Sequence, residues 1–90
     1  MISKPYTIPH TVMVQSVDDE ILLFDSATEL FFSLNDTGAM MWDSISAYHD
    51  LSDVYDELLE TFEVAPEQLE SDLELFVASL AEQGLVVFVK

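Results

Sequence analysis

The chain of 90 residues contains no cysteine, two glycines and two basic residues. Without cysteine it can form neither a disulfide framework nor a thiolate metal site. Gly38 and Gly84 alone cannot build a glycine-rich phosphate loop. The longest apolar run, Leu85 to Val89, is too short to cross a bilayer, and the first residues lack the apolar run of a signal peptide. We therefore expect a cytoplasmic protein that does not contact the membrane.

The charge of the chain is strongly one-sided. Eighteen acidic residues stand against Lys4 and Lys90, which gives a formal net charge of −16. Nucleic-acid binding depends on lysine and arginine to neutralise phosphates, so a nucleic-acid partner is not expected. Such a field attracts cationic partners, and it also keeps a small aromatic-rich domain soluble. Half of the residues are apolar, so we expect one folded domain over residues 1–90 rather than a disordered chain.

Three apolar segments in the first 34 residues have the period of β-strands. They are His10 to Val17, Glu20 to Asp25 and Glu29 to Leu34. The β-branched first segment predicts a strand that is at least partly covered on both faces. Short polar turns at Asp18-Asp19 and at Asp25 to Thr28 favour an antiparallel meander whose third strand has a free edge. Residues 1–9, with two prolines and no periodicity, are expected to form an extended arm.

Helical periodicity begins directly after the third strand. Asn35 or Asp36 can cap a helix that runs to about Ser46 and carries Met41, Trp42 and Ile45 on one face. Ser52 is expected to cap a second helix, and Pro66 to open a third that ends at Gly84. The apolar stripes of these two helices consist of Val54, Leu58, Leu59 and Phe62, and of Leu69, Leu73, Phe76, Val77 and Leu80. The residues after Gly84 are expected to form a short extended tail or strand.

These elements predict an α+β, winged-helix-like domain, in which a three-stranded antiparallel sheet precedes three helices. Leu34, Trp42, Leu73 and Leu80 belong to the expected core. Leu75 lies off the apolar stripe of the third helix, in the same sector as Asp72 and Ser79. It is therefore either an isolated exposed leucine or part of a groove.

No residue pattern in the chain indicates catalysis. His10 and His49 have no spacing that suggests a shared metal, although His49-Asp50 could form half of a ligand set. Most carboxylates fall in turns or on outward helix faces, and no serine or lysine lies in a nucleophile signature. We therefore expect a binding module without a metal or cofactor, and not an enzyme.

Several segments of the chain resemble the PqqD-like family. The resemblance rests on Glu20 to Asp25, Phe31-Phe32-Ser33-Leu34-Asn35, Thr37-Gly38-Ala39, Trp42, and the helical patterns at Leu51 to Val64 and Leu69 to Val86. Together they cover about three quarters of the chain. The family often has a charged residue where this chain has Ala27, and a Gly-Tyr-like pair where it has Glu29-Leu30.

The resemblance implies a recognition domain for ribosomally made, post-translationally modified peptides. Members of the family bind the leader of a precursor peptide and present its core to a modifying enzyme, such as a radical-SAM enzyme in the pyrroloquinoline quinone pathway or a leader peptidase in lasso-peptide pathways. The leader adds as a strand to the third strand and lies against the last helix. The implied peptide-binding residues are Glu29, Leu30, Phe31, Phe32, Ser33, Leu34, Asp72, Leu75, Phe76 and Ser79. The implied partners are the leader peptide and one modifying enzyme, with the protein a monomer or weak dimer.

Two alternatives remain open from the sequence. One is a structural or regulatory winged-helix-like domain that acts through protein contacts, for example a dimer in which two free strand edges pair. The other is a small enzyme or metal carrier, which would depend on His49.

Overall fold

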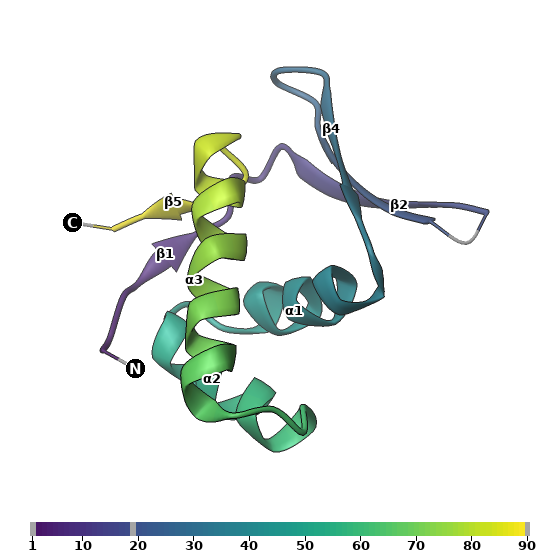
Figure 1. The fold of residues 1–90 in the computed structure, drawn as a ribbon. Helices are drawn as coiled ribbons and strands as arrows, with labels where there is room; N and C mark the ends of the chain where they lie inside the picture. Colours follow the sequence, from purple (N-terminus) through teal and green to yellow (C-terminus); the bar gives the residue numbers. More distant parts are fainter. Residues whose placement is uncertain (1, 19, 90) are drawn as a thin grey trace.

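The computed structural model describes residues 2–18 and 20–89. Its elements, in chain order, are β1 (Tyr6–Thr7), β2 (Val12–Val17), β3 (Glu20–Asp25), β4 (Leu30–Leu34), α1 (Asp36–Ala47), α2 (Leu51–Thr61), α3 (Pro66–Glu82) and β5 (Val87–Phe88) (Figure 1). The predicted α+β architecture, with a three-stranded antiparallel sheet followed by three helices, is confirmed. The expected turn residue Asp19 and the basic residue Lys90 lie outside the described residues.

The three-stranded sheet is an antiparallel meander in the order β2-β3-β4. Asp18 has φ 55° and Glu29 has φ 62°, so a residue in the left-handed region lies in each of the two connections. Aspartate tolerates this region better than most residues, and glutamate does so less readily. Because Glu29 belongs to the turn, β4 begins at Leu30 and not at Glu29 as the alternation predicted.

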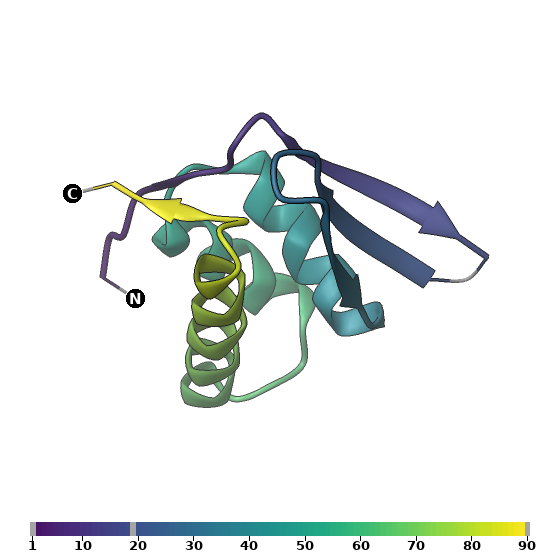
Figure 2. The same cartoon turned by 90° about the horizontal axis from the view of Figure 1, so that it is seen from above.

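The two faces of this sheet differ in what covers them. The inward face carries Leu23, which is fully buried, and Phe32 and Leu34, which pack with the helices. The outward face carries Met13, Phe24 and Phe31 in one row across the three strands. In Figure 2 the helices lie on one side of the sheet and leave the other side open.

The prediction that β2 is covered on both faces is wrong. Only Val12 is partly covered, and the rest of the strand is exposed. The hairpin of β2 and β3 extends away from the helices (Figures 1 and 2), so none of the described helices covers the end of β2. Alternation of β-branched residues indicated a strand, but it could not indicate how far the helices reach.

Local sequence sets the starts of the first two helices. The Asn35 side chain accepts a hydrogen bond from the Gly38 N–H at 2.7 Å and so caps α1, as expected. The expected cap of α2 is wrong by two residues, because Asp50 accepts from the Ser52 N–H at 2.9 Å. α2 therefore begins at Leu51, which is buried in the core.

The third helix has the predicted form. Pro66 occupies its first turn, and Gly84 at φ 77° provides the left-handed residue that ends it. Phe76 is partly buried, and the other residues of its stripe are fully buried, namely Leu69, Leu73, Val77 and Leu80. The expected core residues Leu34, Trp42, Leu73 and Leu80 are all buried.

A second, two-stranded sheet joins the two ends of the described chain. β1 pairs antiparallel with β5, with Tyr6 opposite Phe88. Tyr6 is 1% exposed, and its hydroxyl donates to the Ile45 carbonyl at 2.6 Å. Burial, and then the charges of Asp50 and Asp53, raise the pKa of Tyr6 to about 12. The expected extended arm therefore contains a strand whose tyrosine belongs to the core.

The same arm is held to the start of α2 by one carboxylate. Asp50 accepts hydrogen bonds from the Ser3 hydroxyl, from the Lys4 N–H at 2.9 Å and from Ser52. These bonds, the one from Ser3 foremost, hold the pKa of Asp50 well below its usual range. Asp50 thus both caps a helix and fixes the arm.

Candidate functional site

The outer edge of β4 is open, and it lies on the side of the sheet that is nearest to α3 (Figures 1 and 2). The Ser26 N–H donates to the Thr11 carbonyl at 3.0 Å, which continues the β2-β3 register by one step. In an antiparallel ladder, hydrogen-bonded and non-hydrogen-bonded pairs alternate. This alternation directs the backbone groups of Phe31 and Ser33 to the open edge of β4. An added strand would find two N–H donors and two carbonyl acceptors there.

At the C-terminal end of β4, the strand lies close to both α1 and α3, and the three elements come together around Gly38. A Cβ atom at Gly38 would lie 3.4 Å from Cε1 of Phe76 and 3.5 Å from Cδ2 of Leu34. Both are ordinary van der Waals distances, so Gly38 marks the point where α1, the end of β4 and Phe76 of α3 come together. The tighter contact of such a Cβ atom would be with Oδ1 of Asn35, at 3.1 Å, the oxygen that caps α1.

Three further predicted residues extend from Phe76 along one flank of α3. Successive helical residues are rotated by about 100°, which places Asp72 and Ser79 next to Phe76 and Leu75 further round the helix. Gln68 donates to the Asp72 carboxylate at 2.8 Å, and the Ser79 hydroxyl donates to the Leu75 carbonyl at 3.1 Å. Leu75 is 67% exposed, as its position off the stripe predicted. Phe76, Asp72, Ser79 and Leu75 together form the α3 flank.

Phe31 lies on the outward face of the sheet and does not face α3. Its ring lies 4.7 Å from that of Phe24, centroid to centroid, at an interplanar angle of 39°. It is 59% exposed, since the helices cover only the other face. Leu30 shares the inward face with Phe32 but is exposed, because it lies at the far end of β4. Phe31 thus lies on the opposite face from Leu30 and Phe32, as alternation along a strand requires.

The predicted residues thus fall into three groups. Leu34 and Phe76 meet at Gly38, and Phe32 lies with them on the covered side. Phe31 and Ser33 lie on the open side of β4. Asp72, Leu75 and Ser79 are the exposed members of the α3 flank. Glu29 lies in the turn before β4.

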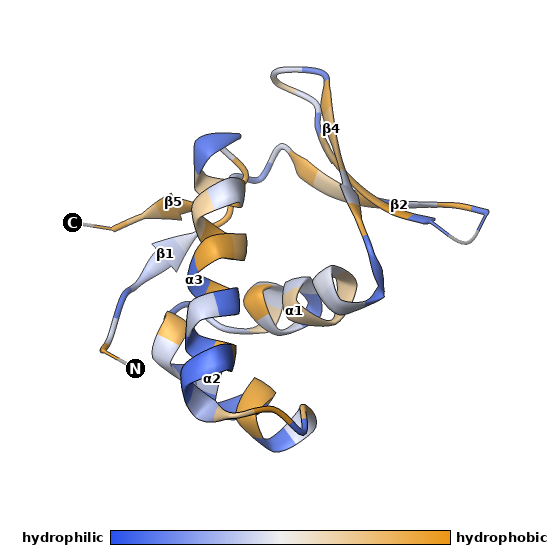
Figure 3. Ribbon diagram, in the orientation of Figure 1, coloured by the Kyte–Doolittle hydropathy of each residue, from blue (hydrophilic) through white to orange (hydrophobic). Residues whose placement is uncertain are grey.

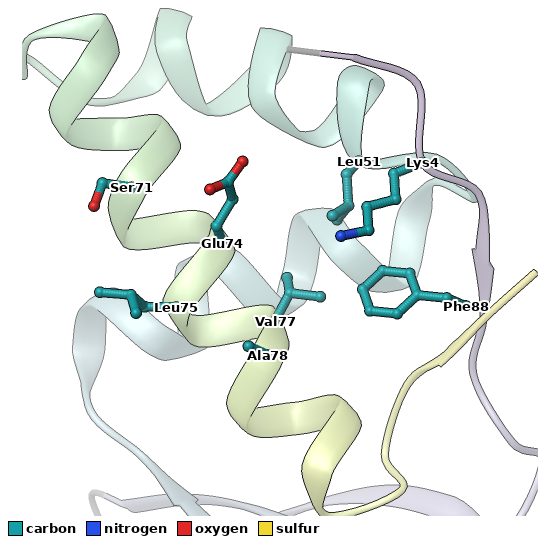
Figure 4. Close-up of a pocket in the computed structure, with 8 residues that line it drawn as sticks. All are labelled: Lys4, Leu51, Ser71, Glu74, Leu75, Val77, Ala78 and Phe88. Carbon is teal, nitrogen blue, oxygen red and sulfur yellow. The ribbon is translucent and has the colours of Figure 1, made fainter.

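A cavity of about 410 Å³ lies next to α3 on the side of the N-terminal arm. Figure 4 shows Val77 and Glu74 of α3 on one side of this cavity, and Leu51, Lys4 and Phe88 on the other. Leu75 points away from Lys4 and Phe88. The Lys4 ammonium lies 4.6 Å from the centre of the Phe88 ring. Sequence reasoning missed this cavity, because its walls come from opposite ends of the chain and no local pattern links them.

Half of the acidic residues lie on α2 and α3. Burial, and then the charges of Glu70, Glu67 and Asp56, raise the pKa of Tyr55. In contrast, β2 and β4 contain no charged residue. The open edge of β4 is therefore a neutral strip on an acidic protein.

Neither histidine lies in a metal site within residues 2–18 and 20–89, where no group of three or more histidine or carboxylate ligands could hold an ion. None of the described helices is both long and apolar enough to cross a membrane.

Taken together, the fold is that of a winged-helix-like α+β domain with an open sheet edge beside its last helix. Residues 20–86 match the family model described as coenzyme PQQ synthesis protein D (PqqD). The chain belongs to this family, as its sequence pattern indicated.

Two solved structures share most of the fold. TbiB1 in complex with the TbiA(beta) leader peptide is 25% identical, with a TM-score of 0.78, over 89% of this chain and 93% of that one. Lasso peptide synthetase B1 complexed with the leader peptide is 26% identical, with a TM-score of 0.77, over 92% of this chain and 98% of that one. Among curated proteins, sequence comparison found no match.

Proposed function

We propose that this chain is a non-catalytic adaptor that binds the leader segment of a ribosomally synthesised precursor peptide. The leader adds as a strand to β4 and lies against the α3 flank, and the adaptor delivers it to a modifying enzyme in the cytoplasm. The observation that carries the proposal is the neutral, open edge of β4 next to α3. Membership of the PqqD family, and the similarity to two proteins solved with leader peptides, support the same function.

Backbone groups provide most of the affinity in this mode of binding. The N–H and carbonyl groups of Phe31 and Ser33 face the open edge and would bond to the leader. Each such bond contributes about 1 kcal/mol net, because it replaces bonds to water. A short leader segment can therefore bind without a deep pocket.

Side chains of the leader would alternate between two different surfaces. Those on the covered side would meet Leu30, Phe32 and the Phe76 end of the α3 flank, where apolar side chains fit. Those on the open side would lie beside Phe31 and Ser33. The Asp72 carboxylate, which Gln68 orients, could pair with a lysine or arginine of the leader. We therefore expect a leader with alternating apolar residues and a nearby basic residue.

A proline substitution at the edge tests the proposal. Ser33→Pro removes one outward N–H, whereas Ser33→Ala keeps it and removes only the hydroxyl. In a calorimetric titration with the leader of the precursor peptide encoded beside this chain, Ser33→Pro should bind at least about tenfold more weakly than Ser33→Ala. Equal binding by the two variants would exclude strand addition at β4.

Amide hydrogen exchange gives a second, independent result. The leader should protect Leu30 to Leu34 together with the α3 flank. Protection confined to α2, or to the residues after Gly84, would place the leader elsewhere.

The alternative is a regulatory domain that acts through protein contacts without a leader. It is favoured by the exposed edge of β2, which a second copy could pair with. A stable homodimer in light scattering, together with no leader binding, would support this alternative.

A further inference from the structure

The sheet has a second open edge, on β2, with an unusual composition. Val12–Val17 contains no charged residue and no proline, although the chain carries eighteen acidic residues. Met13, Val14 and Val17 are 45%, 53% and 49% exposed. Figure 3 shows mainly hydrophobic colouring along this strand, which projects from the molecule.

Exposed edge strands are normally protected against pairing. Proteins shorten them, place lysine or proline on them, or cover them with another element. The edge of β2 has none of these protections, and it is as long as the central strand β3. An exposed six-residue edge with no charged residue and no proline is therefore a feature that a bound strand would explain.

The backbone of β2 is oriented for such a strand. The hydrogen bond between the Ser26 N–H and the Thr11 carbonyl fixes which pairs of β2 and β3 are hydrogen-bonded. By alternation, the N–H groups of Val14 and Ser16 face away from β3. They are available to an incoming strand in the same way as those of Phe31 and Ser33 on β4.

We propose that the β2 edge binds an extended strand of the modifying enzyme, and this inference rests on the proposed function. The strand would be about as long as β2, apolar and uncharged along its length, with lysine or arginine at the end that lies next to the hairpin tip. These basic residues would meet Asp18 and Glu20 at the tip of the hairpin.

Charge decides between the enzyme and a second copy of this chain. Two copies would each bring a net charge of −16 to the interface, whereas a basic segment of another protein is attracted to it. The enzyme and the leader would then occupy opposite edges of one sheet and would not compete. The enzyme could bind the adaptor at β2 while the leader remains bound at β4.

The test uses the full chain, its leader and the modifying enzyme encoded beside it. Ser16→Pro removes an outward N–H of β2, and Ser16→Ala retains it. By biolayer interferometry, Ser16→Pro loaded with leader should bind the enzyme at least about tenfold more weakly than Ser16→Ala, while the leader affinities of the two agree within about twofold. This combination supports the β2 site.

Three results would overturn the inference. Equal enzyme binding by both variants excludes β2 while leaving leader binding at β4 intact. Loss of the leader in Ser16→Pro, with Trp42 fluorescence unchanged, would place the leader on β2 and would also refute the proposed function. A homodimer that Ser16→Pro dissociates would make β2 a self-association edge.

A second variant covers the case in which Ser16→Pro does not fold. Val14→Lys keeps the backbone donor, and its stem can still cover Leu23 across the strand pair. The added positive charge repels a basic strand and blocks edge pairing. It should weaken enzyme binding by roughly tenfold without changing leader binding, and unchanged enzyme binding would count against the site.

Discussion

Phe31→Ala should weaken leader binding by about 1.5 kcal/mol without unfolding the protein. A phenylalanine presents about 200 Å² of surface, so the 59% exposure of Phe31 corresponds to about 120 Å². A leader strand beside β4 would cover about half of this area, and at about 25 cal/mol per Å² the loss is about 1.5 kcal/mol. The dissociation constant should therefore rise roughly tenfold.

The matched control is Met13→Ala at the other end of the same row. Met13 and Phe31 flank Phe24 on the outward face, but Met13 lies on β2, two strands away from the leader edge. Fluorescence anisotropy with a labelled leader measures both variants, and Trp42 fluorescence confirms that each is folded. Binding that is unchanged in Phe31→Ala, or weakened equally in Met13→Ala, would refute contact between the leader and the outward face of β4.

Leu75→Ala should weaken the leader by about 1 kcal/mol and leave α3 intact, because Leu75 is mostly exposed and alanine favours helix; an unchanged leader titration would remove Leu75 from the site. Tyr6→Phe should lower the free energy of unfolding by about 1–2 kcal/mol in urea, because the buried Ile45 carbonyl loses its donor. Burial raises the pKa of Tyr6 to about 12, so its hydroxyl stabilises the fold below pH about 10, and this contribution is lost as pH rises towards about 12. Urea unfolding of Tyr6→Phe should lack this alkaline loss, and a loss equal to that of the wild type would assign it to other groups.

Local chemistry made the centre of the fold predictable. The change of period between Glu29 and Trp42 indicated a strand followed by a helix, and Asn35 caps that helix as expected. The exposure of Leu75 followed from its position off the apolar stripe of α3. Each of these features depends on residues only a few positions apart, which is the range over which periodicity and capping operate.

The unpredicted features depend on residues far apart in the chain. β1 and β5 contain two residues each, too few to show a period, and they exist because Tyr6 is buried against Ile45 and pairs with Phe88. The approach of Phe76 to Gly38, beside the end of β4, brings together residues far apart in the chain. A sequence pattern shows that a glycine is present, but it does not show which element approaches it.

The charged residues of this domain and its two open strand edges lie on different elements. Acidic residues surround Tyr55 on α2 and α3, whereas the two open strands β2 and β4 carry none. Charges on the rim mainly raise the rate of encounter with a basic partner, and their effect is screened by salt. Hydrogen bonds and apolar contacts along a neutral edge are screened much less, so they determine how long the partner stays. The acidic surface would thus attract a basic leader or enzyme, and an open strand edge would bind it only if it offers a matching extended segment.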